Sequence, residues 1–399
     1  MVKNDKKPRL RFKGFTDEWE QRKLGEIAIE IVAGGDIDKD LILDEGRYPV
    51  VANALTNDGI VGYYNSYYRI KVPAVTITAR GDVGHAKARC INFTPVVRLL
   101  TIKTSHDVFF LENAINTLKI VIESTGVPQL TVPQLAKYQL FFPQQIVEEK
   151  QIGLFYKHLD NLITLHQRKY DKLLNEKKAL LDKMFPKNQE KTPKIRFKGF
   201  FDAWEQRKLG EIGDFKSNGV DKLSKPNEIN VNLLNYMDVY NRRKITNKSA
   251  SLLMQVTARP NQIKENNVLK GDVFFTPTSE TADDIGHVMV IEENIKNTVY
   301  SYHLMRYRPH KNNFYLTFPN YCLDTYFVRK QMELSAQGVQ RFVINRKQFE
   351  DLEIRLPSIE EQRKIAVTLT KIDNLITLHQ SKCEKLKNIK KALLDKMFV

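Results

Sequence analysis

The chain of 399 residues carries 63 Lys and Arg against 47 Asp and Glu, a net charge of +16. Its length exceeds one typical domain, and the basic excess favours a polyanionic partner such as nucleic acid. No apolar stretch reaches the length of a membrane span, no signal-peptide pattern opens the chain, and three cysteines lack C-x-x-C spacing. This composition excludes a disulfide framework and predicts a cytoplasmic protein.

A short motif occurs twice in the chain. Residues 8–27 read PRLRFKGFTDEWEQRKLGEI, and residues 193–212 read PKIRFKGFFDAWEQRKLGEI, with 16 of 20 positions identical. A repeat of this kind predicts two tandem halves. Trp19 and Trp204 are the only tryptophans, and each precedes a KLGEI stretch. We expect this stretch to enter the first strand or turn of a domain, and the Trp and Leu side chains to pack that domain against its own long helix.

A variable segment, residues 28–145, follows the first motif. Its β-branched runs at 70–79 and 94–102 predict strands, and residues 108–123 predict a helix. Residues 124–143 contain Gly and Pro and predict a loop followed by a last strand.

The second variable segment, residues 213–358, echoes that plan. Strands are expected at 268–276 and 287–293, and a helix at 320–334. Residues 336–357 match the last stretch of the first segment in residue order. Two domains that share a fold but differ in their interior residues are suited to recognise two different targets from one common scaffold.

Each half ends in a long sequence with heptad-like spacing. Residues 159–185, LDNLITLHQRKYDKLLNEKKALLDKMF, and residues 372–398, IDNLITLHQSKCEKLKNIKKALLDKMF, share 21 of 27 positions. Alternating spacings of four and three favour coiled-coil pairing of two helices, each of about 40 residues and roughly 60 Å long. The predicted seam residues are Leu159, Ile163, Leu173, Leu180, Met184, Ile372, Ile376, Leu386, Leu393 and Met397.

Polar residues occupy matching seam positions in both copies. Antiparallel pairing would place His166 near Cys383 and Lys177 near Ile372, so that like charges avoid each other. Lys177 and Lys390 either extend to water beside the seam or fix its register. The seam histidines are interpreted as structural.

The predicted fold class is α+β: two α/β domains alternating with two long helices that pair as an antiparallel coiled coil, with a pseudo-twofold internal repeat. The predicted parts are a first domain at 1–145, a helix at 146–185, a linker at 186–193, a second domain at 194–358 and a second helix at 359–399.

This order of elements resembles the specificity subunit of a Type I restriction-modification enzyme. The resemblance covers essentially the whole chain. It rests on the W-x-x-x-K-L-G-E-I motifs at Trp19–Ile27 and Trp204–Ile212, on the Glu- and Gln-rich helix starts after Pro143 and Pro357, and on the duplicated D-N-L-I-T-L-H-Q…A-L-L-D-K-M-F helices.

The resemblance implies that each variable segment is a target recognition domain for one half of a bipartite, asymmetric double-stranded DNA sequence. The helices would set the gap between the half-sites and dock two modification subunits, which bring S-adenosylmethionine. Restriction subunits would bring ATP- and Mg-dependent translocation and cleavage, and methylation would fall on adenine N6. This chain would hold no cofactor itself and would have no membrane partner.

Catalytic signatures do not occur in the sequence. It contains no G-x-x-x-x-G-K-[ST], G-x-G-x-x-G, H-E-x-x-H or C-x-x-C motif, and no N-P-P-Y or D-P-P-Y run. We therefore predict a non-catalytic DNA-recognition subunit with no catalytic residue and no metal site. Two alternatives are a coiled-coil scaffold without a DNA role, whose basic charge serves solubility, and a stand-alone DNA-modifying enzyme.

Residue types that contact phosphates and base edges gather in a few expected loops of each variable segment. In the first segment the candidates are Tyr63, Thr78, Arg80, Gly81, Lys87, Arg89, Ser124, Thr125 and Gln129. In the second they are Arg242, Arg243, Lys244, Thr276, Thr278, Ser279, Gln337, Gln340 and Arg341. We expect the loops at 78–82 and 124–129 to correspond to the loops around 276–279 and 337–341.

Overall fold

The computed structural model describes residues 6–120, 126–187 and 190–399. The chain divides into two compact units, each of which contains part of both long helices. Unit 1 comprises residues 1–169 and 379–399, and unit 2 comprises residues 170–378. Among the described residues, no helix combines the length and the apolarity that crossing a membrane requires.

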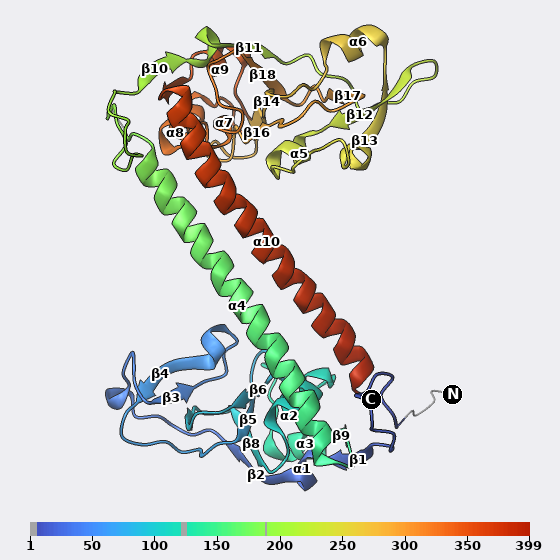
Figure 1. Cartoon of the computed structure of the whole chain (residues 1–399). Helices are drawn as coiled ribbons and strands as arrows, with labels where there is room; N and C mark the ends of the chain where they lie inside the picture. Colours follow the sequence, from blue (N-terminus) through green and yellow to red (C-terminus); the bar gives the residue numbers. More distant parts are fainter. Residues whose placement is uncertain (1–5, 121–125, 188–189) are drawn as a thin grey trace. The chain divides into compact units, whose positions relative to one another are not determined.

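Unit 1 is built on a four-stranded antiparallel sheet (Figure 1). The strand order is β2 (Ala28–Ala33), β8 (Leu100–Thr104), β5 (Ala74–Ile77) and β6 (Ala86–Arg89). Helix α2 (Val108–Thr117) packs on β5 and β6, so every residue of the central strand β5 is buried. A second sheet has the order β4 (Ile60–Tyr64), β3 (Tyr48–Val51) and β7 (Thr94–Pro95).

Unit 2 repeats this plan. Its main sheet has the order β11 (Gly213–Lys216), β18 (Met305–Pro309), β14 (Val273–Phe275) and β16 (Val288–Val290). Its second sheet has the order β13 (Met254–Ala258), β12 (Ile229–Leu234) and β17 (Thr298–Tyr300). Three further elements lie within its variable segment: α5 (Tyr236–Tyr240), α6 (Pro260–Glu265) and the β15 (Thr278–Ser279) and β19 (Phe342–Val343) pair.

The repeated motif forms the first strand of each unit. In unit 1, β1 (Glu20–Lys23) pairs with β9 (Gln139–Phe142), followed by the short helix α1 (Leu24–Ile27). In unit 2, β10 (Glu205–Lys208) pairs with β20 (Glu353–Leu356), followed by the 3-10 turn η3 (Leu209–Glu211). The expected entry into a strand or turn is confirmed.

Each tryptophan packs on its own domain and on the end of the other half's long helix. The Trp19 ring lies 5.7 Å from Phe110 and 6.2 Å from Phe398, and the backbone N–H of Leu10 donates to the carbonyl of Lys396 at 2.9 Å. Trp204 lies 5.7 Å from Phe185. The expected packing against the domain's own long helix is confirmed, because Trp19 shares a core with Ile152 and Trp204 shares one with Ile365. The contact with the other half's helix was not expected.

The two long helices are α4 (Ile146–Met184) and α10 (Ile359–Met397), and they pair antiparallel. In unit 1 the Lys390 ammonium lies 2.7 Å from an Asp160 carboxylate oxygen, and His166 Nδ1 lies 2.8 Å from His379 Nδ1. In unit 2 the Lys177 ammonium lies 2.6 Å from Asp373.

All ten residues of the predicted seam are buried or half-buried in the structure. The expected register holds to within one residue, because Lys177 pairs with Asp373, next to Ile372, and Cys383 contacts Gln167, next to His166. His166 faces His379, whereas the Cys383 thiol lies 3.5 Å from the Gln167 amide oxygen. Both seam lysines are paired with an aspartate across the helix interface, which supports a role in fixing register over simple extension to water.

Three expected elements are interrupted or shorter than expected. Residues 94–102 form two strands in different sheets, because the chain turns at Arg98, which has φ 72°. Helix α2 ends at Thr117, and residues 121–123 of its expected range lie outside the described residues. The helix expected at 320–334 is two helices, α7 (Pro319–Cys322) and α8 (Tyr326–Ser335).

The stretches expected as loop and strand also contain short helices. These are α3 (Val132–Lys137) in unit 1 and α9 (Arg346–Glu350) in unit 2. Each begins with a capping box, made by Thr131 with Gln134 and by Asn345 with Gln348. Their correspondence confirms that the two stretches match in order.

Candidate nucleic-acid interface

Two loops that are distant in sequence lie side by side in unit 1. The first loop connects β5 to β6, and the second precedes α3. The Leu130 N–H donates to the Ala79 carbonyl at 2.8 Å, and the Gly81 N–H donates to the Pro128 carbonyl at 3.1 Å. Arg80 and Gln129 form an isolated antiparallel bridge between the loops. We call this pair of loops the paired-loop surface of unit 1.

Three of the predicted DNA-contacting residues share this surface and are exposed: Arg80, Gly81 and Gln129. Thr78 is different, because it is buried and its hydroxyl oxygen accepts a hydrogen bond from the His85 N–H at 3.0 Å. Thr78 therefore anchors the loop rather than facing solvent. Ser124 and Thr125 lie outside the described residues.

Unit 2 has an equivalent paired-loop surface. Strand β15 pairs with β19, and the Ile344 N–H donates to the Pro277 carbonyl at 2.9 Å, as Leu130 does to Ala79 in unit 1. The Arg341 guanidinium donates to the Thr278 hydroxyl at 3.3 Å. Arg341 is exposed, as are the two predicted glutamines, Gln337 and Gln340.

Two further candidates in unit 2 are inward-facing. Thr276 is fully buried, and its hydroxyl oxygen accepts from the His287 N–H at 2.9 Å. Ser279 is also buried, and its hydroxyl donates to the carbonyl of Thr281. The expected correspondence between the loops of the two segments is thus present in the structure, but only part of each loop is accessible.

A four-residue motif at the base of both hairpins was not recognised from the sequence. Asp82-Val-Gly-His85 in unit 1 matches Asp284-Ile-Gly-His287 in unit 2. In each, a carboxylate oxygen of the aspartate lies within hydrogen-bond distance of the histidine Nε2, at 2.8 Å and 2.9 Å. The detectable signal was the D-x-G-H tetrapeptide, found at the same place in two otherwise dissimilar segments.

The remaining candidates of unit 1 are held by protein groups. The Arg89 guanidinium donates to the Thr76 hydroxyl at 2.9 Å and to the Asp58 carbonyl at 2.8 Å, and burial lowers its pKa. The Lys87 ammonium lies 3.5 Å from Asp58 and 3.9 Å from Glu112. Tyr63 is half-buried on β4 of the second sheet.

The basic run Arg242–Lys244 of unit 2 follows α5 and is neutralised locally. Arg242 pairs with Asp324 at 2.7 Å, Arg243 with Asp238 at 3.3 Å, and Lys244 with Glu292 at 3.1 Å. All three line a cavity of about 270 Å³. A phosphate would have to displace these carboxylates, so the run is a weaker candidate than its charge suggested.

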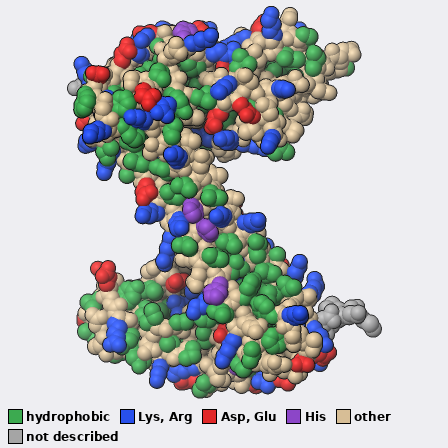
Figure 2. All heavy atoms as spheres, viewed as in Figure 1, with side chains coloured by type: hydrophobic (Ala, Val, Ile, Leu, Met, Phe, Trp, Pro, Cys, Tyr) green, Lys and Arg blue, Asp and Glu red, His purple; other side chains and the backbone are tan. Residues whose placement is uncertain are grey.

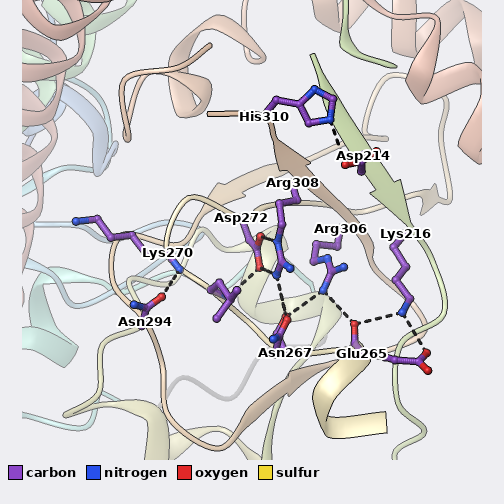
Figure 3. A network of polar contacts seen from close by, with 11 residues as sticks. Asp214, Lys216, Glu265, Asn267, Lys270, Asp272, Asn294, Arg306, Arg308 and His310 are labelled. Carbon is purple, nitrogen blue, oxygen red and sulfur yellow. Dashed lines mark hydrogen bonds and ion pairs between the residues drawn. The ribbon is translucent and has the colours of Figure 1, made fainter. Parts of the chain in front are cut away.

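A second polar network in unit 2 has a structural role (Figure 3). The Arg308 guanidinium makes two hydrogen bonds to the buried Asp272 carboxylate, at 2.6 Å and 2.7 Å, and these raise the pKa of Arg308. The Arg306 guanidinium donates to the Asn267 carbonyl at 3.1 Å. These bonds tie β18 to the turn that precedes β14.

Charges of both signs are mixed on the face of the protein that Figure 2 draws, where Lys and Arg side chains are interspersed with Asp and Glu. Within the described ranges, no cluster of three or more His, Cys, Asp or Glu side chains is arranged to hold a metal ion.

The family model for the Type I restriction modification DNA specificity domain matches residues 16–175 and 202–388. The Type I restriction enzyme MjaVIII specificity subunit of Methanocaldococcus jannaschii is 22% identical over 400 residues, which cover 95% of this chain and 92% of that protein. S.MpnORF507P of Mycoplasma pneumoniae, assigned as a type I specificity subunit, is 30% identical over 132 residues, or 32% of this chain.

The chain spans 36% of S.MpnORF507P and 47% of a second Mycoplasma pneumoniae relative, S.MpnORF89P. The crystal structure of the S subunit of the Type-I restriction-modification system from M. genitalium matches with a TM-score of 0.69 at 16% identity. The match covers 98% of this chain and 99% of that one. This likeness shows the fold.

Proposed function

Because the chain belongs to the Type I restriction modification DNA specificity domain family, we propose that it is the sequence-specific DNA-binding specificity subunit of a Type I restriction-modification complex. The observation that carries the proposal is the equivalence of the two paired-loop surfaces. Their backbone hydrogen bonds match, whereas their exposed side chains differ: Arg80 and Gln129 in unit 1, and Gln337, Gln340 and Arg341 in unit 2.

A shared backbone with different exposed side chains suits two readers of different sequence. Arginine can make bidentate hydrogen bonds to guanine, and glutamine can do so to adenine. The two surfaces carry these residue types at different positions and in different numbers, so they would contact different base sequences. Each unit would then read one half of a bipartite, asymmetric target in double-stranded DNA.

We propose that α4 and α10 set the gap between the half-sites and dock two modification subunits. Leu162 and Leu165 of α4 are 46% and 47% exposed, and Leu375 and Leu378 of α10 are 44% and 45% exposed. These pairs occupy identical positions of the repeated D-N-L-I-T-L-H-Q sequence. Two identical apolar faces fit two copies of one partner, and truncating them should reduce its binding.

The chain itself would perform no reaction. S-adenosylmethionine would be supplied by the modification subunits, and ATP with Mg would be used by restriction subunits. The residues Arg80 and Gln129, like Arg341, are proposed to bind DNA and to orient it for those partners.

The test of DNA binding uses the purified full chain and a duplex at several salt concentrations. Phosphate contacts release counterions, so we expect log K to fall steeply and linearly with log salt. A coiled-coil scaffold without a DNA role would show no such slope. Incubation of the chain alone with DNA and S-adenosylmethionine should give no methylation, which distinguishes it from a stand-alone enzyme.

Arg80→Ala tests whether one unit reads one half-site. We expect a loss of roughly 1–3 kcal/mol of discrimination at one half of the target, because a bidentate base contact contributes about that much. Methylated-adenine sequencing of DNA from a strain carrying the complex would show relaxed bases in one half only. Arg22→Ala, at an exposed ion pair with Glu20, is the matched control. Equal relaxation of both halves would contradict the assignment.

A further inference from the structure

We propose that His85 and His287 bind DNA phosphates through Nδ1, without reading sequence, and that each does so as an imidazolium held by the aspartate of its D-x-G-H turn. The inference rests on the proposed DNA-binding function and adds a contact that is common to both units. It also makes DNA binding by this chain dependent on proton uptake.

The D-x-G-H turn has the same hydrogen bonds in both units. In unit 1, the Thr78 N–H donates to the His85 carbonyl at 3.0 Å, and the Gly84 N–H donates to the Thr78 carbonyl at 2.8 Å. In unit 2, the Thr276 N–H donates to the His287 carbonyl at 3.1 Å, and the Gly286 N–H donates to the Thr276 carbonyl at 3.0 Å. The D-x-G-H turn therefore has the same backbone conformation in both units.

The loop tip between the threonine and the aspartate differs between the units. It is Ala-Arg-Gly at 79–81 in unit 1 and PTSETAD at 277–283 in unit 2. The histidine occurs at the base of both loops although the loop tips differ. It is therefore suited to a DNA contact that both units make. Phosphate contacts position a protein on DNA and carry no sequence information directly, so they are the contacts that two different readers can share.

The chemistry of the histidine follows from its hydrogen bond. Each Nε2 faces an aspartate oxygen, at 2.8 Å in unit 1 and 2.9 Å in unit 2, so Nε2 carries the proton. In the part of the chain that the structure describes, neither Nδ1 has a hydrogen-bond partner. A neutral imidazole donates from one nitrogen only, whereas an imidazolium donates from both. Donation from Nδ1 to a phosphate therefore requires uptake of one proton per histidine.

Two cations lie beside His85 and could contact the same phosphate. Its ring is half exposed and lines a cavity of about 110 Å³ together with Lys87, Arg89 and Asp58. With Asp82 as its direct partner, the charged groups around the ring are two cations and two carboxylates. Glu112, 3.9 Å from Lys87, adds a third carboxylate, so protonation of His85 brings the net charge of these groups from negative to zero.

His287 is more enclosed than His85. The Tyr240 ring lies 4.3 Å from the His287 ring, and its hydroxyl donates to the Asp284 carboxylate at 3.2 Å, which raises the pKa of Tyr240. The Arg329 guanidinium donates to the Asp283 carbonyl at 2.6 Å. The tyrosine holds the Asp284 carboxylate that contacts the imidazole, and the arginine holds the backbone just before Asp284.

The experiment measures binding of the full chain to a fluorescein-labelled duplex of randomised sequence, about four helical turns long. Affinity is determined across a salt series at about pH 6 and about pH 8, a range in which histidine changes charge. For the unsubstituted chain we expect tighter binding at the lower pH. For His85→Gln with His287→Gln, we expect roughly tenfold weaker binding at the lower pH and a salt slope smaller by about two, one for each lost phosphate contact.

His310→Gln is the matched control. His310 Nε2 lies 3.1 Å from the Asp214 carboxylate, so it is also an exposed His–Asp pair in unit 2 (Figure 3). It follows Pro309 at the end of β18, whereas the hairpin begins beyond the opposite end of the paired strands β14 and β18. We expect its salt slope and pH dependence to equal those of the unsubstituted chain.

A second variant tests the proposal even if the glutamine variant is less stably folded. His85→Lys with His287→Lys retains a cation at both pH values, so we expect the salt slope to recover and the pH dependence to shrink. If the substitutions leave both the slope and the pH dependence unchanged, the inference is overturned while DNA binding stands. If the unsubstituted chain shows no salt-dependent binding, the proposed function itself fails.

Discussion

Arg11 illustrates how single residues join the repeated motif to the long helix. Its guanidinium makes two hydrogen bonds to the Glu148 carboxylate, at 2.8 Å and 2.7 Å, and Glu148 is only 1% exposed. Arg196 and Glu361 form the same pair in unit 2, and this contact raises the pKa of Arg196. Both glutamates lie in the first helical turn, where the helix dipole favours negative charge.

Arg11→Met should lower the free energy of unfolding by about 3–5 kcal/mol, because it leaves a buried carboxylate without its partner. Urea denaturation followed by circular dichroism measures the change. Arg22→Met removes an exposed ion pair with Glu20 and should cost about 0–1 kcal/mol. If both variants lost the same free energy of unfolding, burial of Glu148 would not explain the contribution of the Arg11–Glu148 pair to stability.

At the scale of elements, α4 and α10 are aligned by two equivalent ion pairs. Lys390 pairs with Asp160 in unit 1, and Lys177 pairs with Asp373 in unit 2. The aspartates belong to the repeated D-N-L-I-T-L-H-Q sequence, so one register satisfies both pairs. A shift of the helices by one turn would separate both lysines from their partners.

Lys177→Asp should destabilise the helix pair by roughly 1–2 kcal/mol, since it places two carboxylates together where the pair is only partly exposed. Adding Asp373→Lys should restore most of that loss by recreating the ion pair in reverse. A double-mutant cycle on thermal unfolding measures the coupling. Additive losses would rule out a register role for this pair.

The facing histidines of the helices predict a pH dependence. Burial, followed by the neighbouring charges of His166, Lys169 and Lys382, lowers the pKa of His379 from its ordinary value of 6.5. The unfolded chain then binds protons that the folded chain does not, so stability is complete above pH 6.5 and falls as the pH drops through that value toward the folded pKa.

We expect a lower Tm at about pH 5 than at about pH 8, and a smaller difference in His379→Gln, which cannot be protonated there. Differential scanning calorimetry at several pH values provides the measurement. His310→Gln, which lies outside the helices, should retain the full difference. If His379→Gln showed the same pH dependence of Tm as the unsubstituted chain, His379 would not be the cause of that dependence.

For the molecule as a whole, the proposed function makes helix length a determinant of the DNA target. A heptad inserted after Gln167 in α4 and after Gln380 in α10 keeps the seam in phase and adds roughly 10 Å to each helix. With about 3.4 Å per base pair, we expect the gap between half-sites to grow by about one to three base pairs.

Sequencing methylated adenines in cells that carry the lengthened chain and its partners would reveal the new gap. The bases within each half should stay the same, because the paired loops are untouched. A changed half-site with an unchanged gap would mean that the helices do not set the spacing.

Much of the architecture could be predicted from repetition and periodicity. The heptad spacing located α4 and α10, and the lysine positions indicated their antiparallel arrangement. The break at Arg98 was missed because β-branched content marks strand propensity and says nothing of a left-handed residue that moves the chain between sheets. The inward orientation of Thr78 and Thr276 was missed because burial at a hairpin base depends on tertiary packing. The D-x-G-H tetrapeptide is present twice in the sequence, but the basic residues around it were weighed in its place.

One contact described above bears on how the protein is made. Met397 and Phe398, near the end of the printed chain, lie in the hydrophobic core of the first domain, and the Phe398 ring is 5.4 Å from Phe110 and 5.9 Å from Tyr156. On the ribosome, the first domain is synthesised long before these two residues emerge. Its core therefore stays partly open to water until Met397 and Phe398 have been synthesised.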